Sequence, residues 1–443
     1  MPVAKLLLTM SVPMMISMLV QALYNIVDSM FVAKLSEDAL TAVSLAFPVQ
    51  NLMIAVGTGT GVGINALVSR ALGEKRNEYA NSAANNGIYL AIFSFIGFAI
   101  VSGLFAPAFF HVQTTDAKIA AYGVDYVRVI GIMSFGLFIQ LVGEKLLQST
   151  GMTIYSMATQ LLGAVINIIL DPIMIFGLLG FPRLEVTGAA LATVTGQIIA
   201  AIVGMIVNVK VNKELHISLK KYRISGEVIR EIYSVGFPSI IMASVGSIMT
   251  FGMNKILMGF TSTATAVFGV YFKLQSFVFM PVFGLNNGMV PIVAYNYGAR
   301  KPDRITKAIR LSIAYGVCIM LAGFAVFQLF PGSLLDIFSA SASMKEIGIP
   351  ALRIISLSFL IAGFSVVASS VFQALGHGFL SLAVSVLRQL FVLLPAAFIL
   401  AKVGGLRVCW WAFPIAEVFS GIICFVFIRY AYKKEIHPLY EKR

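Results

Sequence analysis

Charged residues are scarce in this chain. They make up 12% of the 443 residues, whereas 59% are hydrophobic, and the mean hydropathy is +0.91. Ordinary soluble domains carry about 25% charged residues. The low charge content therefore excludes an ordinary soluble domain and indicates a chain that lies mainly in lipid.

Cysteine and histidine are also rare, with 3 and 4 copies. An odd number of cysteines within or beside apolar runs implies no disulfide framework. The histidines, His111, His216, His377 and His437, are far apart and lack metal-ligand spacing. The sequence has no HExxH motif, nucleophile elbow or Walker motif. We therefore expect neither an enzyme nor a bound cofactor or metal, and no direct use of ATP.

Apolar runs of about 20 residues or more recur along the chain, each long enough to cross a hydrocarbon core of about 30 Å. They predict an all-α membrane protein with twelve transmembrane helices. We place these spans near residues 6–33, 39–69, 79–108, 118–147, 153–180, 187–209, 229–258, 263–295, 305–331, 347–375, 379–401 and 407–431.

The net charge of +13 is unevenly distributed between alternate loops. Basic residues gather in residues 70–76, 210–230 and 300–310 and at the C-terminus, whereas the other loops carry few. By the positive-inside rule, this pattern places both termini in the cytoplasm. The basic charge therefore indicates membrane topology, and it argues against nucleic acid as a partner.

The second half of the chain repeats the first at a constant offset of 225 residues. The matched pairs are Pro13 and Pro238, Gln50 and Gln275, Gly63 and Gly288, Gly73 and Gly298, Gln148 and Gln373, Gly151 and Gly376, and Gly196 and Gly421. Each half holds six spans, an even number, so the two repeats have the same orientation in the membrane. We predict an N-lobe over residues 1–208, a cytoplasmic linker over 209–227, a C-lobe over 228–432 and a cytoplasmic tail over 433–443.

Two aspartates, Asp28 and Asp171, lie in apolar surroundings in the first half. A charged side chain near a bilayer centre costs several kcal/mol, so such a residue normally faces a cavity and binds a proton, an ion or a partner charge. Asn167 lies one helical turn before Asp171, on the same face. The equivalent positions of the second half are Met253 and Ala396. A cation site would therefore belong to the first half alone.

We expect the faces that carry Asp28 and Asp171 to meet. Two close carboxylates in a poorly solvated cavity would not both ionise easily and could share one proton. Alternatively, Asp28, Asn167, Asp171 and Thr193 form an oxygen set suited to Na+. A third interpretation makes the aspartates protonated hydrogen-bonding contacts between helices. The expected substrate-binding residues are Gln21, Tyr24, Asn25 and Asn51.

Other features of the spans have simpler interpretations. Arg388 and Glu417 could form an ion pair in the second half, with either a functional or a structural role. Glu144 and Lys145 lie toward the end of the fourth span, where snorkelling or local pairing is expected. The run of small residues over 57–63 predicts close contact between helices.

Several segments together resemble the multidrug and toxin extrusion (MATE) family. They are residues 11–13, 23–32, 73–77, 148–151, 167–177, 188–193 and 411–417. The resemblance implies two six-helix lobes and antiport of cationic, often aromatic drugs against H+ or Na+. It also implies that Asp28, Asn167, Asp171 and Thr193 form the cation site. Some branches of the family place acids in the seventh and tenth spans; residues 239–258 and 349–375 have none, which favours branches that rely on the N-lobe.

The resulting prediction is multidrug efflux in a bacterial inner (plasma) membrane, by a monomer surrounded by lipid, with H+ or Na+ as the coupling ion. One alternative is a flippase for lipid-linked saccharides with the same architecture. Its cavity would be strongly cationic, and only Arg388, Lys255 and Lys273 hint at that. Another alternative is a receptor or channel without a transport cycle, against which a twofold repeat with acids in one half argues.

Overall fold

The computed structural model describes residues 1–441, and every regular element among them is helical. In this part of the chain, ten helices are long and apolar enough to cross a membrane, and two bent pairs raise the number to twelve. The prediction of twelve spans is confirmed. The ten are α1 (Val3–Leu35), α2 (Glu37–Gly73), α3 (Asn77–Gln113), α6 (Thr153–Phe176), α7 (Glu185–Lys210), α8 (Gly226–Met258), α9 (Ser262–Gly298), α10 (Pro302–Leu329), the run α14 (Gly378–Val386), η1 (Leu387–Leu393) and α15 (Leu394–Cys409), and the run α16 (Ala412–Ala431), η2 (Tyr432–Ile436) and α17 (His437–Glu441).

The fourth and tenth spans are broken rather than straight. Helices α4 (Ala117–Ile132) and α5 (Phe135–Ser149) meet at 47°, and α12 (Ala342–Ser356) and α13 (Phe359–Ala374) meet at 52°. A short helix, α11 (Pro331–Asp336), precedes the second pair. Hydropathy predicted continuous spans here because the residues on both sides of each break are apolar.

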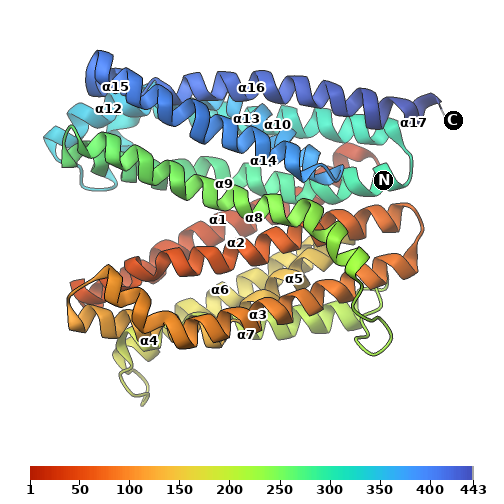
Figure 1. The fold of residues 1–443 in the computed structure, drawn as a ribbon, viewed down its shortest axis with the longest axis horizontal. Helices are drawn as coiled ribbons and strands as arrows, with labels where there is room; N and C mark the ends of the chain where they lie inside the picture. The colour runs from red at the N-terminus through yellow and green to blue at the C-terminus, as the bar shows by residue number, and fades with distance from the viewer. Residues whose placement is uncertain (442–443) are drawn as a thin grey trace. The chain divides into compact units, whose positions relative to one another are not determined.

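By internal contacts the chain forms two compact units. The N-unit contains residues 16–236, and the C-unit contains residues 1–15 together with residues from Phe237 onward. Contacts therefore place the start of α1 with the second half and the start of α8 with the first (Figure 1). The division predicted from sequence, with a linker over 209–227, did not include this exchange of helix ends.

Glycines on α2 and α9 explain the exchange. A Cβ at Gly288 would lie 2.7 Å from Ser11 Cα, and one at Gly284 would lie 2.5 Å from Met15 Cα, so α1 begins in backbone contact with α9. A Cβ at Gly63 would lie 2.1 Å from the carbonyl oxygen of Ile232, so α8 begins in the same contact with α2. Because residues 63 and 288 are equivalent in the repeat, the two halves receive the exchanged ends at equivalent places. The small-residue run over 57–63 is thus a packing face.

The backbone follows the 225-residue offset in detail. Helices α2 and α9 begin and end at equivalent residues, and α3 and α10 begin at equivalent residues. Ser36 and Thr261 cap α2 and α9, and each side chain accepts a hydrogen bond from the amide three residues later. The left-handed residues repeat too: Lys75 and Arg300, Gly151 and Gly376, and Gly180 and Gly405.

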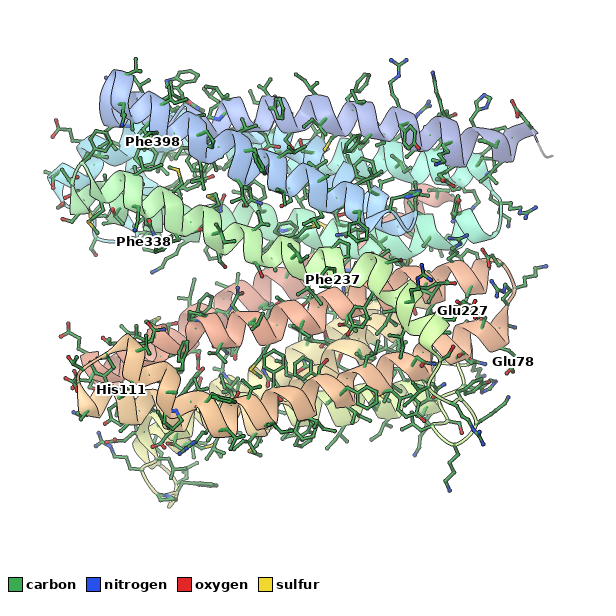
Figure 2. The ribbon with its side chains drawn as sticks, viewed as in Figure 1. Glu78, His111, Glu227, Phe237, Phe338 and Phe398 are labelled. Atoms are coloured by element: carbon green, nitrogen blue, oxygen red, sulfur yellow. The ribbon has the colours of Figure 1, made fainter. Side chains whose placement is uncertain are left out.

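Each unit has its own hydrophobic core. The N-unit core extends from Val32 to Ile232, and the main C-unit core combines Val3, Leu7 and Met10 with residues from Met249 onward. Within the N-unit, Glu78 and His111 mark opposite ends of α3, and Glu227 lies at the Glu78 end (Figure 2). The N-unit's basic segments predicted to be cytoplasmic, over residues 70–76 and 210–230, lie at this end.

Candidate cation and substrate site

Asn167 and Asp171 occupy one buried face of α6. The Asn167 side chain is 2% exposed and that of Asp171 0%. Asn167 Nδ2 donates a hydrogen bond to Asp171 Oδ2 at 3.1 Å, as their spacing of one helical turn allows. The amide thus orients the carboxyl group while both are kept away from lipid.

Asp28 brings a second carboxyl group to this face from α1. Its side chain lies beside Asp171 and Asn167, close enough for the two carboxyl groups to interact electrostatically. All three residues belong to the N-unit. The structure therefore brings together two acids that are 143 positions apart in the sequence (28 and 171), and the expectation that their faces meet agrees with this geometry.

Three oxygen atoms at this meeting point lack a hydrogen-bond partner within residues 1–441. They are Asp28 Oδ1, Asn167 Oδ1 and Asp171 Oδ1, and all three are buried. Buried polar atoms are normally paired, because an unsatisfied one costs about 1–3 kcal/mol. An oxygen-only set suits a proton shared between carboxylates or a hard cation.

Tyrosine and threonine side chains border the carboxyl pair. The Tyr24 hydroxyl on α1 lies beside the Thr193 side chain on α7, which is 3% exposed. Tyr126 on α4 is 2% exposed and close enough to interact electrostatically with both aspartates. Its hydroxyl donates to Gln50 Oε1 at 3.4 Å. Thr193 thus reaches the site through Tyr24, and α4 also contributes to it.

Close packing of α6 against α7 fixes the position of Thr193 relative to Asn167 and Asp171. A Cβ at Gly196 would lie 2.6 Å from the carbonyl oxygen of Gly163, and one at Gly188 would lie 2.4 Å from that of Met174. The two helices are therefore in backbone contact on both sides of Thr193. They run along each other in the N-unit (Figure 1).

The expected substrate-binding residues are placed unevenly. Tyr24 is half-buried at the carboxyl pair, and Asn51 on α2 is half-buried. Gln21 and Asn25 are exposed on α1. A role for these four side chains in binding substrate stays a prediction.

Sequence reasoning missed Tyr126 and Gln50 as neighbours of the aspartates. Gln50 had one signal, since it matches Gln275 in the repeat. There, the Tyr271 hydroxyl donates to Gln275 Oε1 at 2.9 Å. Nothing in the sequence distinguishes Tyr126 from the other tyrosines, because its position depends on how α4 packs within the N-unit.

Glu144 and Lys145 do not snorkel. Their side chains are 3% and 6% exposed. Glu144 accepts hydrogen bonds from Gln140 Nε2 at 2.8 Å and Gln160 Nε2 at 2.6 Å, and Lys145 Nζ donates to Gln148 Oε1 at 2.9 Å. Of the two expectations for this pair, snorkelling is wrong and local pairing is confirmed: Gln140 and Gln148 on α5 and Gln160 on α6 provide buried partners.

Arg388 and Glu417 form an ion pair in the C-unit. Arg388 Nη1 lies 3.4 Å from Glu417 Oε2, and the side chains are 27% and 9% exposed. Arg388 belongs to the π-helical segment η1, and Glu417 belongs to α16. Whether the pair takes part in transport stays a prediction.

The fold and site define a multi-pass membrane protein of two repeated halves, with a pair of buried aspartates in the first. The sequence model of the MatE family matches residues 13–173 and 238–399, the same stretch of each repeat. The chain therefore belongs to the MatE family, a family of transporters rather than enzymes.

Relatives in sequence and structure cover nearly the whole chain. The multidrug export protein MepA of Staphylococcus haemolyticus is 27% identical over 441 residues, which cover 98% of this chain and 94% of that protein. MepA of Staphylococcus aureus is 27% identical over 419 residues, covering 94% and 91%. Among solved structures, an outward-facing multidrug resistance MATE transporter of the MOP superfamily matches with a TM-score of 0.92 and 28% identity, covering 100% of this chain and 97% of that one. A MOP superfamily transporter from Pyrococcus furiosus, whose reversed pocket polarity suggests a different function, matches with a TM-score of 0.90 and 28% identity, covering 98% and 97%.

Proposed function

We propose that this protein exports cationic and aromatic small molecules from the cell by secondary active antiport against H+ or Na+. The export of several drugs is supported by the MepA relatives, which are multidrug export proteins. We place the protein as a monomer in the plasma membrane of a bacterium, with both termini in the cytoplasm, as the positive-inside rule favours.

One observation carries the coupling part of the proposal. Asp28 and Asp171 approach each other from different helices, and three buried oxygen atoms around them lack partners in the described chain. A cation that binds there would satisfy these atoms and link α1 to α6. It can shift a conformational equilibrium only by its differential affinity for the two states, and a site assembled from two helices provides such a difference if α1 moves.

The helix α1 is suited to this movement. It contains Pro13, which removes a backbone donor and loosens the helix near that residue. The border between the C-unit and the N-unit crosses α1 between Met15 and Ile16, close to this proline. In the proposed cycle, the cation enters from outside, occupies the aspartate pair and bends α1, and the drug leaves outward. Release of the cation inside then resets the cycle.

The test is efflux of ethidium from energised cells or inverted vesicles, with the pH and Na+ gradients imposed separately. Transport driven by the pH gradient alone would make the aspartates the proton carriers. A requirement for Na+ would make Asn167 and Thr193 ion ligands. Transport under neither gradient would overturn the antiport proposal and favour the flippase.

Asparagine variants address the two acids directly. We expect Asp28→Asn and Asp171→Asn each to abolish coupled efflux at normal abundance. The matched control is Asp125→Asn, because Asp125 is an exposed aspartate on α4 of the same unit. Full efflux by both site variants would contradict the proposed role of the pair.

A further inference from the structure

A cavity of about 550 Å³ lies in the C-unit, between α10, α13 and the C-terminal run from α16 to α17. On the C-terminal run its lining mostly follows one helical stripe with spacings of three and four residues, and Ala431 lies beside that stripe: Phe425, Ile428, Arg429, Ala431, Tyr432, Lys433, Ile436 and His437. Figure 1 shows this run ending at the C-terminus. The cavity therefore lies at the end of the unit that the positive-inside rule assigns to the cytoplasm.

The lining changes from apolar to basic along the stripe. Phe425 and Ile428 come first, and Arg429, Lys433 and His437 follow toward the chain end. From Phe425 to Lys433 the helix rises about 12 Å. Arg310 on α10 adds a further cation at the cavity. The cavity thus has the polarity of a phospholipid, with an apolar inner part and a cationic outer part.

Three of the four basic side chains in this cavity lack an acidic partner; the fourth, His437, has its Nδ1 3.6 Å from Glu441 Oε1. Among residues 1–441, the ion pairs include neither Arg310 nor Arg429 nor Lys433. A nearby carboxylate, Glu435, is engaged elsewhere: it accepts a hydrogen bond from the Tyr297 hydroxyl, and its Oε1 lies 3.2 Å from His377 Nε2. The positive charges of Arg310, Arg429 and Lys433 surround one cavity without an acidic partner, so they favour binding of an anion there.

The N-unit shows what covers the equivalent place in the other repeat. The offset of 225 residues takes Thr306 and Arg310 to Asn81 and Asn85 on α3, and takes Lys433 and His437 to Asn208 and Asn212 at the end of α7. All four cationic or hydroxyl side chains are thus replaced by asparagine. A cationic site is absent from the N-unit at these positions.

Two of those asparagines, Asn81 and Asn85, bind the linker peptide, and Asn212 belongs to it. Asn81 Oδ1 accepts from the His216 amide at 2.8 Å, and Asn85 Oδ1 accepts from the Ser218 amide at 2.8 Å. Asn212 Nδ2 donates to Thr150 Oγ1 at 3.1 Å and to Asn208 Oδ1 at 3.3 Å. In the N-unit, the chain itself therefore covers this end. In the C-unit the chain continues as α17 instead, and the equivalent cavity keeps its unpaired cations.

We propose that the cavity binds an anionic phospholipid of the cytoplasmic leaflet. Its phosphate lies among Arg310, Arg429 and Lys433, and its upper acyl chain lies along Phe425 and Ile428. Basic pockets between transmembrane helices on the cytoplasmic side commonly bind anionic headgroups. The bound lipid takes the place that the linker holds in the N-unit, and it joins α10 to α16. This site goes beyond the proposed export function and requires no particular coupling ion.

The test is native mass spectrometry of the purified full-length protein titrated with phosphatidylglycerol, and with phosphatidylcholine as the zwitterionic comparison. We expect tighter retention of phosphatidylglycerol. Arg310→Gln and Lys433→Gln should each weaken it by about fivefold, because each removes one cation at the headgroup. The matched controls are Lys307→Gln and Lys434→Gln, which make the same charge change outside the cavity lining; they should stay within about twofold.

Two outcomes would overturn the proposal. One is equal loss of phosphatidylglycerol in the site variants and their matched controls, which would mean general attraction to a basic surface. The other is that inorganic phosphate at equal concentration displaces the lipid, which would mean a free-anion site. The measurement uses no gradient and no drug, so its result is independent of whether ethidium efflux occurs.

Discussion

Asn167 donates a hydrogen bond to Asp171 from one helical turn away, at 3.1 Å between Nδ2 and Oδ2. This bond uses the donor of the amide and leaves Asn167 Oδ1 and Asp171 Oδ1 buried without partners in residues 1–441. The pair thus presents two acceptor atoms beside the carboxyl group of Asp28. The asparagine has two functions in this arrangement: it orients one carboxyl group, and it supplies a neutral oxygen.

Replacement of Asn167 tests both functions. In Asn167→Ala we expect the cation concentration for half-maximal efflux to rise about tenfold or more, because a hydrogen bond to a charged group contributes about 1.5–3 kcal/mol. Ethidium efflux measured over a range of pH or Na+ concentrations would show the shift. The control is Thr195→Ala, which removes a hydroxyl bonded to Leu191 of its own helix. Unchanged cation dependence in Asn167→Ala would contradict the assigned role.

The contact between α6 and α7 predicts a sharp difference between two glycines of α7. A methyl group at Gly196 would lie 2.6 Å from the Gly163 carbonyl oxygen, whereas one at Gly204 would meet its nearest atom, Thr159 Cγ2, at 3.7 Å. We expect Gly196→Ala to destabilise the protein by about 1–3 kcal/mol, because the two backbones must separate. Gly204→Ala should be neutral or stabilising by up to about 1 kcal/mol, since alanine favours the helix.

Thermal unfolding of both variants in detergent measures this difference. Ethidium efflux should fall in Gly196→Ala, because separation of the helices moves Thr193 away from Tyr24. Equal melting temperatures for the two variants would show that the contact is less tight than the structure indicates.

Much of this fold is predictable because its information is local or repeated. Hydropathy predicts the twelve spans. The repeat predicts that Thr261 caps its helix as Ser36 does, and that Gly376 is left-handed as Gly151 is. The carboxyl pair was predictable as well, since an acid in an apolar run is costly and needs a partner. In each case, the signal lies in a short segment or in its counterpart in the repeat.

What escaped prediction depends on contacts between distant segments. The exchange of helix ends depends on contacts at Gly63 and Gly288, but the sequence does not indicate which helix packs against each of these glycines. Tyr126 lies near the aspartates through the packing of α4 in the N-unit, which hydropathy does not reveal. Glu144 resembled a snorkelling residue because its amide partner Gln160 lies on another helix.

The ion pair in the C-unit can be separated into structural and functional parts. Glu417→Gln leaves Arg388 without its partner and should lower stability by about 1–3 kcal/mol, less than for a fully buried pair because Arg388 is 27% exposed. The double variant Arg388→Met with Glu417→Gln should recover part of this loss, because no charge stays unpaired.

Melting temperature and efflux, measured together, distinguish the two roles. Recovery of both in the double variant indicates a structural pair, whereas recovered stability without efflux indicates a role in transport. The control is Asp38→Asn, which breaks the exposed pair with Lys118 and should cost under about 1 kcal/mol. A stability of Glu417→Gln equal to that of the unchanged protein would contradict the prediction.

The linker between the repeats should be held to the N-unit chiefly by Asn85. This side chain is fully buried; its amide donates to the carbonyl oxygens of Asn81 and His216 and its oxygen accepts from the Ser218 amide. In Asn85→Ala the linker groups lose buried partners, each worth about 1–3 kcal/mol, so the linker should open about tenfold more often. Trypsin cleavage at Lys220, Lys221 or Arg223 should then accelerate by a similar factor.

Tyr89→Phe is the control. It removes only the hydrogen bond from the Tyr89 hydroxyl to the Leu219 carbonyl oxygen, which is 2.7 Å long and lies at an exposed site, and it should accelerate cleavage much less. Equal cleavage rates in the two variants would mean that the basic segment is held by its charges rather than by these asparagines.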